Sequence, residues 1–213
     1  MNGRATPADQ TPLPNAPFAQ SAPVLAALLL GGGHGKRAGG PKALKIKDGI
    51  PLWQWQCHQL RSQGCAPVIA VLHPSAWPVQ ADHADCTVAA DPDATLFASL
   101  QLGLAEVPYD HAVLVLPVDC PLPSRAVVES LRQAVKDADQ QGIFWSLIRP
   151  ALPSGQAGHP IVLSAAWQTE LRALDARTAR LDQLSHQLER RRIDVVCEDP
   201  GILANFNVDG IGL

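Results

Sequence analysis

The chain has 213 residues, of which 17 are Lys or Arg and 20 are Asp or Glu, so its formal net charge at pH 7 is −3. This length suits one domain or two small ones, and it can bury a core without disulfides or metals. Hydrophobic residues make up 46% and charged residues 17%, which excludes an intrinsically disordered chain. The mild negative charge gives no electrostatic footprint for nucleic acid, so we expect no nucleic-acid partner.

Cysteine usage and hydropathy indicate the expected compartment. The five cysteines are an odd number and none lies in a C-x-x-C spacing, which argues against a disulfide framework or a thiolate zinc site. The longest apolar run, from Ala22 to Leu30, is too short to span a bilayer. The basic start and the cleavage site of a signal peptide are also missing around it. We therefore expect a cytoplasmic protein with reduced thiols and no membrane partner.

Residues 1–23 hold five of the 19 prolines and no periodic apolar pattern, which predicts a flexible Pro-rich tail before a folded domain over 24–213. In that domain, apolar runs ended by Gly or Pro predict buried strands, and amphipathic segments predict helices, with Ser124 and Ser164 as N-caps. The elements expected in chain order are strand 24–30, helix 52–64, strand 67–72, strand 87–90, helix 95–104, strand 112–117, helix 124–142, strand 142–149, strand 161–164, helix 164–174, helix 178–191 and strand 193–198. Strands that alternate with helices predict an α/β domain with a mostly parallel sheet.

A glycine-rich loop, GGGHGKRAGGPK (31–42), directly follows the first predicted strand. Glycines let backbone N–H groups approach a phosphate closely, and Lys36, Arg37 and Lys42 add positive charge, so the loop predicts a site for several phosphate groups. Two common phosphate motifs fit poorly. A P-loop fails at Leu30 and Arg37, and a dinucleotide fingerprint lacks the acidic residue expected after the second strand.

The loop satisfies the pattern G-x-[GS]-x-R-x-G-x-x-K at every position, from Gly33 to Lys42. On this motif the sequence resembles the molybdenum cofactor guanylyltransferase and cytidylyltransferase family of nucleotidyltransferases. The resemblance implies a single three-layer, Rossmann-like nucleotidyltransferase domain that contains an NTP site. The residues that it assigns to nucleotide binding are Leu30, Gly31, Gly32, Gly33, Gly35, Arg37, Lys42 and Ser99.

A carboxylate follows the apolar strand 112–117, in the segment PVDCPL. An acid placed there lies at the carboxyl edge of the sheet, where a ligand binds and where it can hold Mg²⁺. The pattern P-x-D-x-P-L is also the second signature of the family, and the resemblance makes Asp119 a catalytic residue and a metal ligand. Near the C-terminus the segment NFNVD (205–209) resembles the family's N-x-N, which implies Asn207 as the second ligand. The sequence departs from the family after Asn207, so Asp209 is an alternative ligand.

Two further segments bear on the substrates. Gly158-His159-Pro160 resembles the G-H-P of the cytidylyltransferase branch and implies that His159 contacts the acceptor phosphate. Ser99 stands in a segment like the S-L-x-x-G-L of that branch, near the base. These agreements favour CTP over GTP, although Leu30 to Gly33 and Asn207 are closer to the guanylyl branch.

The resemblance implies an enzyme that uses Mg²⁺ to transfer a nucleoside monophosphate from an NTP to a phosphorylated acceptor, with release of pyrophosphate. Arg37 and Lys42 would neutralise the charge that builds on the leaving pyrophosphate. Molybdopterin is the leading acceptor, and a molybdoenzyme or its chaperone would be the protein partner. Two alternatives stay open: a nucleotide-binding module without turnover, and an NAD(P)-dependent oxidoreductase.

Overall fold

The computed structural model of the protein describes residues 24–36, 39–76, 84–180 and 192–206, so the predicted tail lies outside the described residues. Among the described helices, none has the length and apolar character needed to cross a bilayer. The main elements are β1 (Leu25–Gly31), β2 (Ile46–Lys47), β3 (Ile50–Pro51), α1 (Leu52–Ser62), β4 (Val68–Leu72), β5 (Cys86–Ala89), α2 (Leu96–Leu104), β6 (Ala112–Pro117), α3 (Arg125–Gln140), β7 (Leu147–Ala151), β8 (Ile161–Leu163), α4 (Ala165–Ala173) and β9 (Arg192–Val196).

Seven of the described strands form one sheet in the order β5-β4-β1-β6-β8-β7-β9. β1 pairs in parallel with β4 and β6, β5 with β4, and β9 with β7, while β8 runs antiparallel to β6 and β7. The prediction of a mostly parallel sheet is confirmed. Leu30 lies opposite Val71 on one side and Pro117 on the other, so the carboxyl ends of β1, β4 and β6 share one edge.

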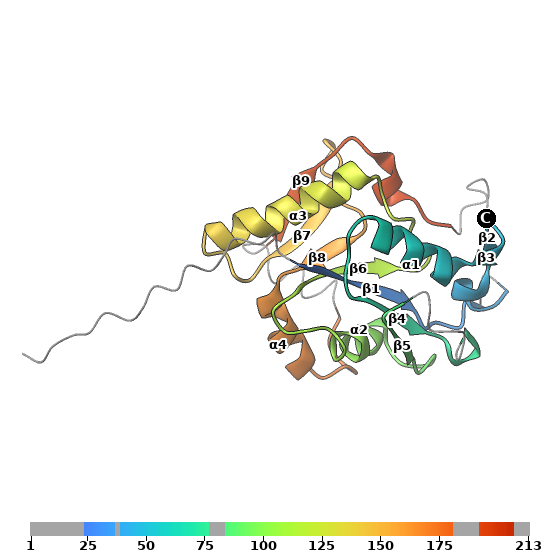
Figure 1. Ribbon diagram of the computed structural model, residues 1–213. Coiled ribbons are helices and arrows are strands. Elements are labelled where there is room, and N and C mark those ends of the chain that lie inside the picture. Colours follow the sequence, from blue (N-terminus) through green and yellow to red (C-terminus); the bar gives the residue numbers. More distant parts are fainter. Residues whose placement is uncertain (1–23, 37–38, 77–83, 181–191, 207–213) are drawn as a thin grey trace, which may run out of the picture.

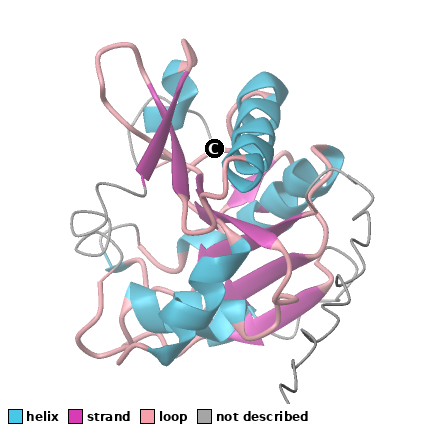
Figure 2. Cartoon of the chain, turned by 90° about the vertical axis from the view of Figure 1, so that its left-hand side faces the viewer, coloured by secondary structure: helices cyan, strands magenta, loops and turns pink. Residues whose placement is uncertain are grey.

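Helices cover both faces of this sheet, which makes three layers (Figures 1 and 2). Trp53 of α1 and Leu131 of α3 belong to the apolar core on one face. Phe97 of α2 and Trp167 of α4 belong to the core on the other face. Every residue of β1 is buried, and successive residues alternate between the two cores. This burial on both faces explains why β1 reads as an unbroken apolar run, as strands of parallel sheets do.

Several local features differ from the sequence expectations. Neither Ser124 nor Ser164 caps its helix with its side chain. The Ser164 hydroxyl instead donates to the carbonyl of Phe144 at 2.7 Å. The strand expected over 142–149 begins at Leu147, because residues 142–145 form an exposed loop. The hairpin of β2 and β3, whose two-residue Asp-Gly loop has positive φ at both positions, was not predicted. Residues 178–180 are not helical, and 181–191 lie outside the described residues.

Candidate functional site

The glycine-rich loop leaves the end of β1 at the carboxyl edge of the sheet. Gly32 is buried, and a Cβ atom added to it would collide with the Cβ of Ala90 and lie 3.4 Å from the Ser99 hydroxyl. Gly35 has a φ of +60°, and its carbonyl accepts from the Gly40 N–H at 3.2 Å, which closes the loop. The backbone therefore needs glycine at both positions.

The predicted loop residues have different surroundings. Gly33 and Lys36 are exposed, and Gly31 is buried against Ala43 and Val118. Leu30 is buried at the end of β1. Arg37 lies outside the described residues, so its predicted contact with the nucleotide stays a prediction.

Lys42 and Asp119 form an ion pair below this loop. The Lys42 ammonium donates to Asp119 Oδ2 over 2.6 Å, and the two side chains are 26% and 20% exposed. Lys42 begins a short 3-10 helix that follows the glycine loop, while Asp119 follows β6. The two predicted catalytic residues therefore come together from positions 77 residues apart in the chain.

The C-terminal segment reaches the same carboxylate. The Asn205 amide donates to Asp119 Oδ2 over 3.3 Å, and the Phe206 N–H donates to the Asp119 carbonyl over 2.7 Å. Asn207 and Asp209, the two ligands suggested by the sequence, lie outside the described residues. The sequence motif does not predict this contact of Asn205, because its register against Asp119 depends on how the chain returns after β9.

Gln56 of α1 supports the turn that carries Asp119, and sequence reasoning missed it. This glutamine is fully buried, and its amide donates to the carbonyl of Cys120 over 2.7 Å and to that of Val118 over 3.4 Å. A polar residue on the buried face of an amphipathic helix is the signal that could have found it, because buried amides need hydrogen-bond partners.

His159 precedes β8 and lines the site from the opposite side. Its backbone N–H donates to the Ile202 carbonyl over 2.8 Å, while its ring Nδ1 is buried with no hydrogen-bond partner among the described residues. Burial lowers the pKa of this imidazole, and the negative charge of Asp119 opposes that shift only partly. The ring is therefore neutral at pH 7 and can donate one hydrogen bond.

A second polar cluster connects the glycine loop to the loops that follow β4 and precede α2. His34 Nε2 lies 3.0 Å from an oxygen of Asp93, and His34 Nδ1 lies 3.4 Å from His73 Nε2. His73 follows β4 and Asp93 precedes α2, so three loops at the sheet edge are linked. Neither His73 nor Asp93 was predicted, because a contact between loops 39 and 59 residues apart has no local sequence signal.

Ser99 lies in the first turns of α2 and is 9% exposed. The helix begins at Leu96, and Thr95 before it is the N-cap, because its hydroxyl accepts from the Ala98 N–H over 3.1 Å. A Cβ atom added to Gly32 would lie 3.4 Å from the Ser99 hydroxyl, so Ser99 lies beside the glycine loop. Its contact with a nucleotide base stays a prediction.

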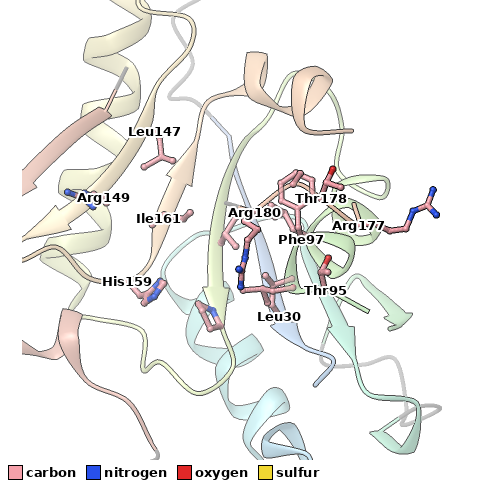
Figure 3. A pocket seen from close by; sticks show the side chains of 15 residues that line it. Leu30, Thr95, Phe97, Leu147, Arg149, His159, Ile161, Arg177, Thr178 and Arg180 are labelled. Carbon is pink, nitrogen blue, oxygen red and sulfur yellow. The ribbon is translucent and has the colours of Figure 1, made fainter. Parts of the chain in front are cut away.

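A pocket of about 740 Å³ opens next to these residues (Figure 3). Leu30 and Phe97 line it on one side, and His159 and Ile161 line it on the other. Across the described part of the chain, no group of three or more His, Cys, Asp or Glu side chains could hold a metal ion.

Comparison with solved structures supports this fold. Rv0371c from Mycobacterium tuberculosis H37Rv aligns with a TM-score of 0.64 at 19% identity, covering 84% of this chain and 90% of that one. The nucleotidyl transferase Mth528 from Methanothermobacter thermautotroptrophicus aligns with a TM-score of 0.63 at 18% identity, covering 86% and 93%. The 2-C-methyl-D-erythritol 4-phosphate cytidylyltransferase of Thermus thermophilus aligns with a TM-score of 0.57 at 19% identity, covering 85% and 92%.

At these identities the likeness establishes the fold alone. No curated protein matches the chain. The sequence itself matches the MobA-like NTP transferase domain over residues 27–193, which is most of the chain and includes both the glycine loop and Asp119. The chain belongs to the MobA-like NTP transferase family.

Proposed function

We propose that this nucleotidyltransferase moves a nucleoside monophosphate from an NTP to a phosphorylated acceptor and releases pyrophosphate. The observation that carries the proposal is the convergence of Lys42 and Asn205 on the Asp119 carboxylate, below a loop whose backbone requires glycine. A cation and a carboxylate at the end of a phosphate-binding loop suit phosphoryl chemistry, in which positioning and charge neutralisation lower the barrier.

The donor set at this site fits Mg²⁺. That ion binds one or two carboxylates and completes its shell with substrate phosphates and water, and Asp119 supplies one partly exposed carboxylate. Asp119 and, by the family motif, Asn207 would hold the ion, which would supply charge neutralisation at the phosphates. Rv0371c, one of the similar structures, has been solved as a complex with manganese, which supports a divalent ion in this fold.

The chain's own residues have separate tasks in this proposal. The loop from Leu30 to Gly35 binds the triphosphate through its N–H groups. Lys42 and Arg37 donate to the phosphates that leave. The neutral His159 donates a hydrogen bond to the acceptor phosphate, an oxygen of which attacks the α-phosphorus as the bond to the β-phosphate breaks. Pyrophosphate departs with the electron pair of that bond.

Ser99 beside Gly32 and the Gly158-His159-Pro160 segment support CTP over GTP as the nucleotide. Molybdopterin is the acceptor that we favour, with a molybdoenzyme or its chaperone as the receiving protein. The five free cysteines support a cytoplasmic location. The family match gives no support to the oxidoreductase alternative.

Thermal unfolding with each of CTP, GTP, ATP, UTP and NADPH, with and without Mg²⁺, tests the nucleotide. A ligand at 100 times its Kd adds about 2.7 kcal/mol. For a chain of this size each kcal/mol moves Tm by roughly 2–4 °C. We expect a shift of several degrees with CTP that grows with Mg²⁺. A shift with NADPH alone would contradict the proposal.

Pyrophosphate release with CTP and molybdopterin then tests the transfer. We expect release that depends on both substrates and on Mg²⁺. Binding of CTP without release from any phosphorylated acceptor would instead support a nucleotide-binding module that has lost turnover. The departure from the family motif after Asn207 is the observation that makes this second outcome worth testing.

A further inference from the structure

The C-terminal segment runs from β9 toward the hairpin of β2 and β3, where a lysine and two aromatic rings meet (Figure 1). The Lys47 ammonium of β2 lies over the Trp55 ring at 5.3 Å from its centroid, and over the Phe206 ring at 5.7 Å. The two rings meet edge to face, with centroids 6.4 Å apart and an interplanar angle of 84°. A cation within about 6 Å of an aromatic face is attracted to it. We call Lys47, Trp55 and Phe206 the aromatic clasp.

The hairpin side of the clasp is held by its own hydrogen bonds. Trp55 Nε1 donates to Asp48 Oδ2 over 2.9 Å, which connects α1 to the turn of the hairpin. Asp48 and Gly49 of that turn have φ of +50° and +83°, as tight hairpin loops require. The Leu52 N–H donates to the Lys45 carbonyl over 2.7 Å at the base of the hairpin. The hairpin and the first turn of α1 therefore form one connected support for the clasp.

Phe206 is the member of the clasp that reaches Asp119. Its side chain is buried, and its N–H donates to the Asp119 carbonyl over 2.7 Å. The residue before it, Asn205, donates its amide to Asp119 Oδ2 over 3.3 Å. The residue after it, Asn207, is the metal ligand that the family motif implies. The ring held by the clasp therefore belongs to the residue between these two asparagines.

The earlier part of the C-terminal segment has other anchors. The Asp199 carboxylate accepts from the Ser124 N–H over 3.0 Å at the start of α3. The Ile202 carbonyl accepts from the His159 N–H over 2.8 Å. These contacts hold residues 199–202 independently of the hairpin, whereas the clasp holds Phe206. Loosening the clasp should therefore release only the part of the segment nearest Asp119.

We propose that the aromatic clasp positions Phe206, and with it the two flanking asparagines, against Asp119, so that Lys47 and Trp55 are positioning residues for the divalent ion. This inference rests on the proposed transfer reaction, which uses that ion. In this role Lys47 acts through the rings of Trp55 and Phe206. The affinity for CTP in the absence of a divalent ion should therefore not depend on the charge of Lys47.

Hydrogen exchange of the Phe206 amide, resolved by NMR in the full chain, tests the clasp without metal or substrate. Lys47→Met keeps an apolar stem and removes the charge, so we expect this amide to exchange about threefold faster or more. Lys47→Arg should restore the rate of the wild type, because a guanidinium also pairs with aromatic faces. The Ile202 amide, which donates to the Asp199 carbonyl over 3.3 Å, should exchange at the same rate in all three proteins.

Calorimetric binding of two forms of one nucleotide tests whether the clasp acts on the ion. The probes are the manganese complex of CTP, and CTP alone in the presence of EDTA. We expect Lys47→Met to raise the Kd of the manganese complex about threefold or more and to leave the Kd of CTP in EDTA unchanged. Lys47→Arg should restore the affinity for the manganese complex. Lys136→Met on α3 is the control, because it removes the same charge from another half-buried lysine.

The outcomes separate this inference from the proposed function. Unchanged exchange of the Phe206 amide in Lys47→Met would overturn the clasp. Equal losses of affinity for CTP with and without manganese, or an equal effect of Lys136→Met, would overturn its role toward the ion. Thermal unfolding of each variant verifies that the fold is retained. If the wild type bound neither CTP nor its manganese complex, the proposed function would fail, while the exchange of the Phe206 amide would still decide the clasp.

Discussion

At the scale of single residues, one carboxylate oxygen connects three distant segments. Asp119 Oδ2 accepts from Lys42 and from Asn205, so the glycine loop, the end of β6 and the C-terminal segment share one acceptor atom. When an NTP enters, Lys42 can exchange its bond to Asp119 for one to a phosphate, because both acceptors carry negative charge.

This arrangement predicts the effect of changing either member of the pair. Asp119→Asn keeps the size of the side chain but removes its charge, so we expect it to abolish turnover while the fold persists. We expect Lys42→Ala to lose at least tenfold in kcat/KM, about 1.4 kcal/mol. Steady-state pyrophosphate release measures both. If Asp119→Asn had the kinetics of the wild type, Asp119 would not be the metal ligand. If Lys42→Ala had the kinetics of the wild type, the loop would not contact the triphosphate.

We expect substitution of Gln56 to lower both the stability of the protein and its activity. In Gln56→Ala the carbonyls of Val118 and Cys120 lose a buried donor, which costs about 1–3 kcal/mol for an unsatisfied group. We expect turnover to fall as well, because that turn orients Asp119. Urea unfolding and pyrophosphate release measure the two effects. Gln133→Ala on the exposed face of α3 is the control, and equal destabilisation of both variants would contradict the role of Gln56.

Local patterns singled out both members of the Lys42–Asp119 ion pair, but they did not indicate the contacts around it. Lys42 and Asp119 stand in motifs that can be read without knowing the fold. Asn205 contacts Asp119 across 86 residues, and Gln56 of α1 contacts the carbonyls of Val118 and Cys120 on either side of it across 62 and 64 residues. Such contacts depend on how far each element extends and how it is rotated, which no local pattern specifies.

At the scale of elements, the direction of β8 decides at which edge of the sheet His159 lies. The apolar run over 161–163 predicted a strand but not its direction, since apolar content is the same for both. β8 follows a loop instead of a crossover helix, and it inserts antiparallel between β6 and β7. Because of that direction, the start of β8 and His159 lie at the edge where β6 ends. A parallel strand would have placed His159 at the opposite edge.

Helix α2 depends on a glycine where it crosses the sheet. A Cβ atom at Gly103 would collide with Leu28 and lie 2.8 Å from a methyl group of Val71. Alanine favours the helix by up to about 1 kcal/mol over glycine, whereas overpacking costs typically about 1–3 kcal/mol. We therefore expect Gly103→Ala to destabilise the protein in urea unfolding. Leu102→Ala, at a 38% exposed position of the same helix, is the control. A gain in stability for Gly103→Ala would show that α2 has room to move.

At the scale of the whole molecule, titratable groups whose pKa values change on folding limit stability at both ends of the pH range. Burial holds the pKa of His159 below its ordinary value. The hydrogen bond that the Ser124 N–H donates to the Asp199 carboxylate holds the pKa of Asp199 below its ordinary value. A group whose pKa is lowered by folding stabilises the protein above its unfolded pKa and loses that contribution as pH falls. His159 therefore begins to weaken the fold below about pH 6.5, and Asp199 follows below about pH 4.

The buried thiols act in the opposite direction. Burial raises the pKa of Cys57 and Cys120 to about 12 and that of Cys65 to about 11. A raised pKa stabilises the fold below the unfolded value of about 8.5, and this contribution is lost as pH rises through the folded values. We expect the free energy of unfolding, measured with urea under reducing conditions, to be highest between about pH 6.5 and 8.5.

Two variants separate the acidic and alkaline limbs of this profile. His159→Gln removes the imidazole, so the decline that begins below about pH 6.5 should become shallower while the alkaline limb stays the same. Cys57→Ala removes a thiol that is fully buried in the core under α1, so the decline above about pH 8.5 should become shallower although the protein is less stable at neutral pH. If the acidic limb keeps its slope in His159→Gln, His159 does not control stability at low pH. If the alkaline limb keeps its slope in Cys57→Ala, Cys57 does not control stability at high pH.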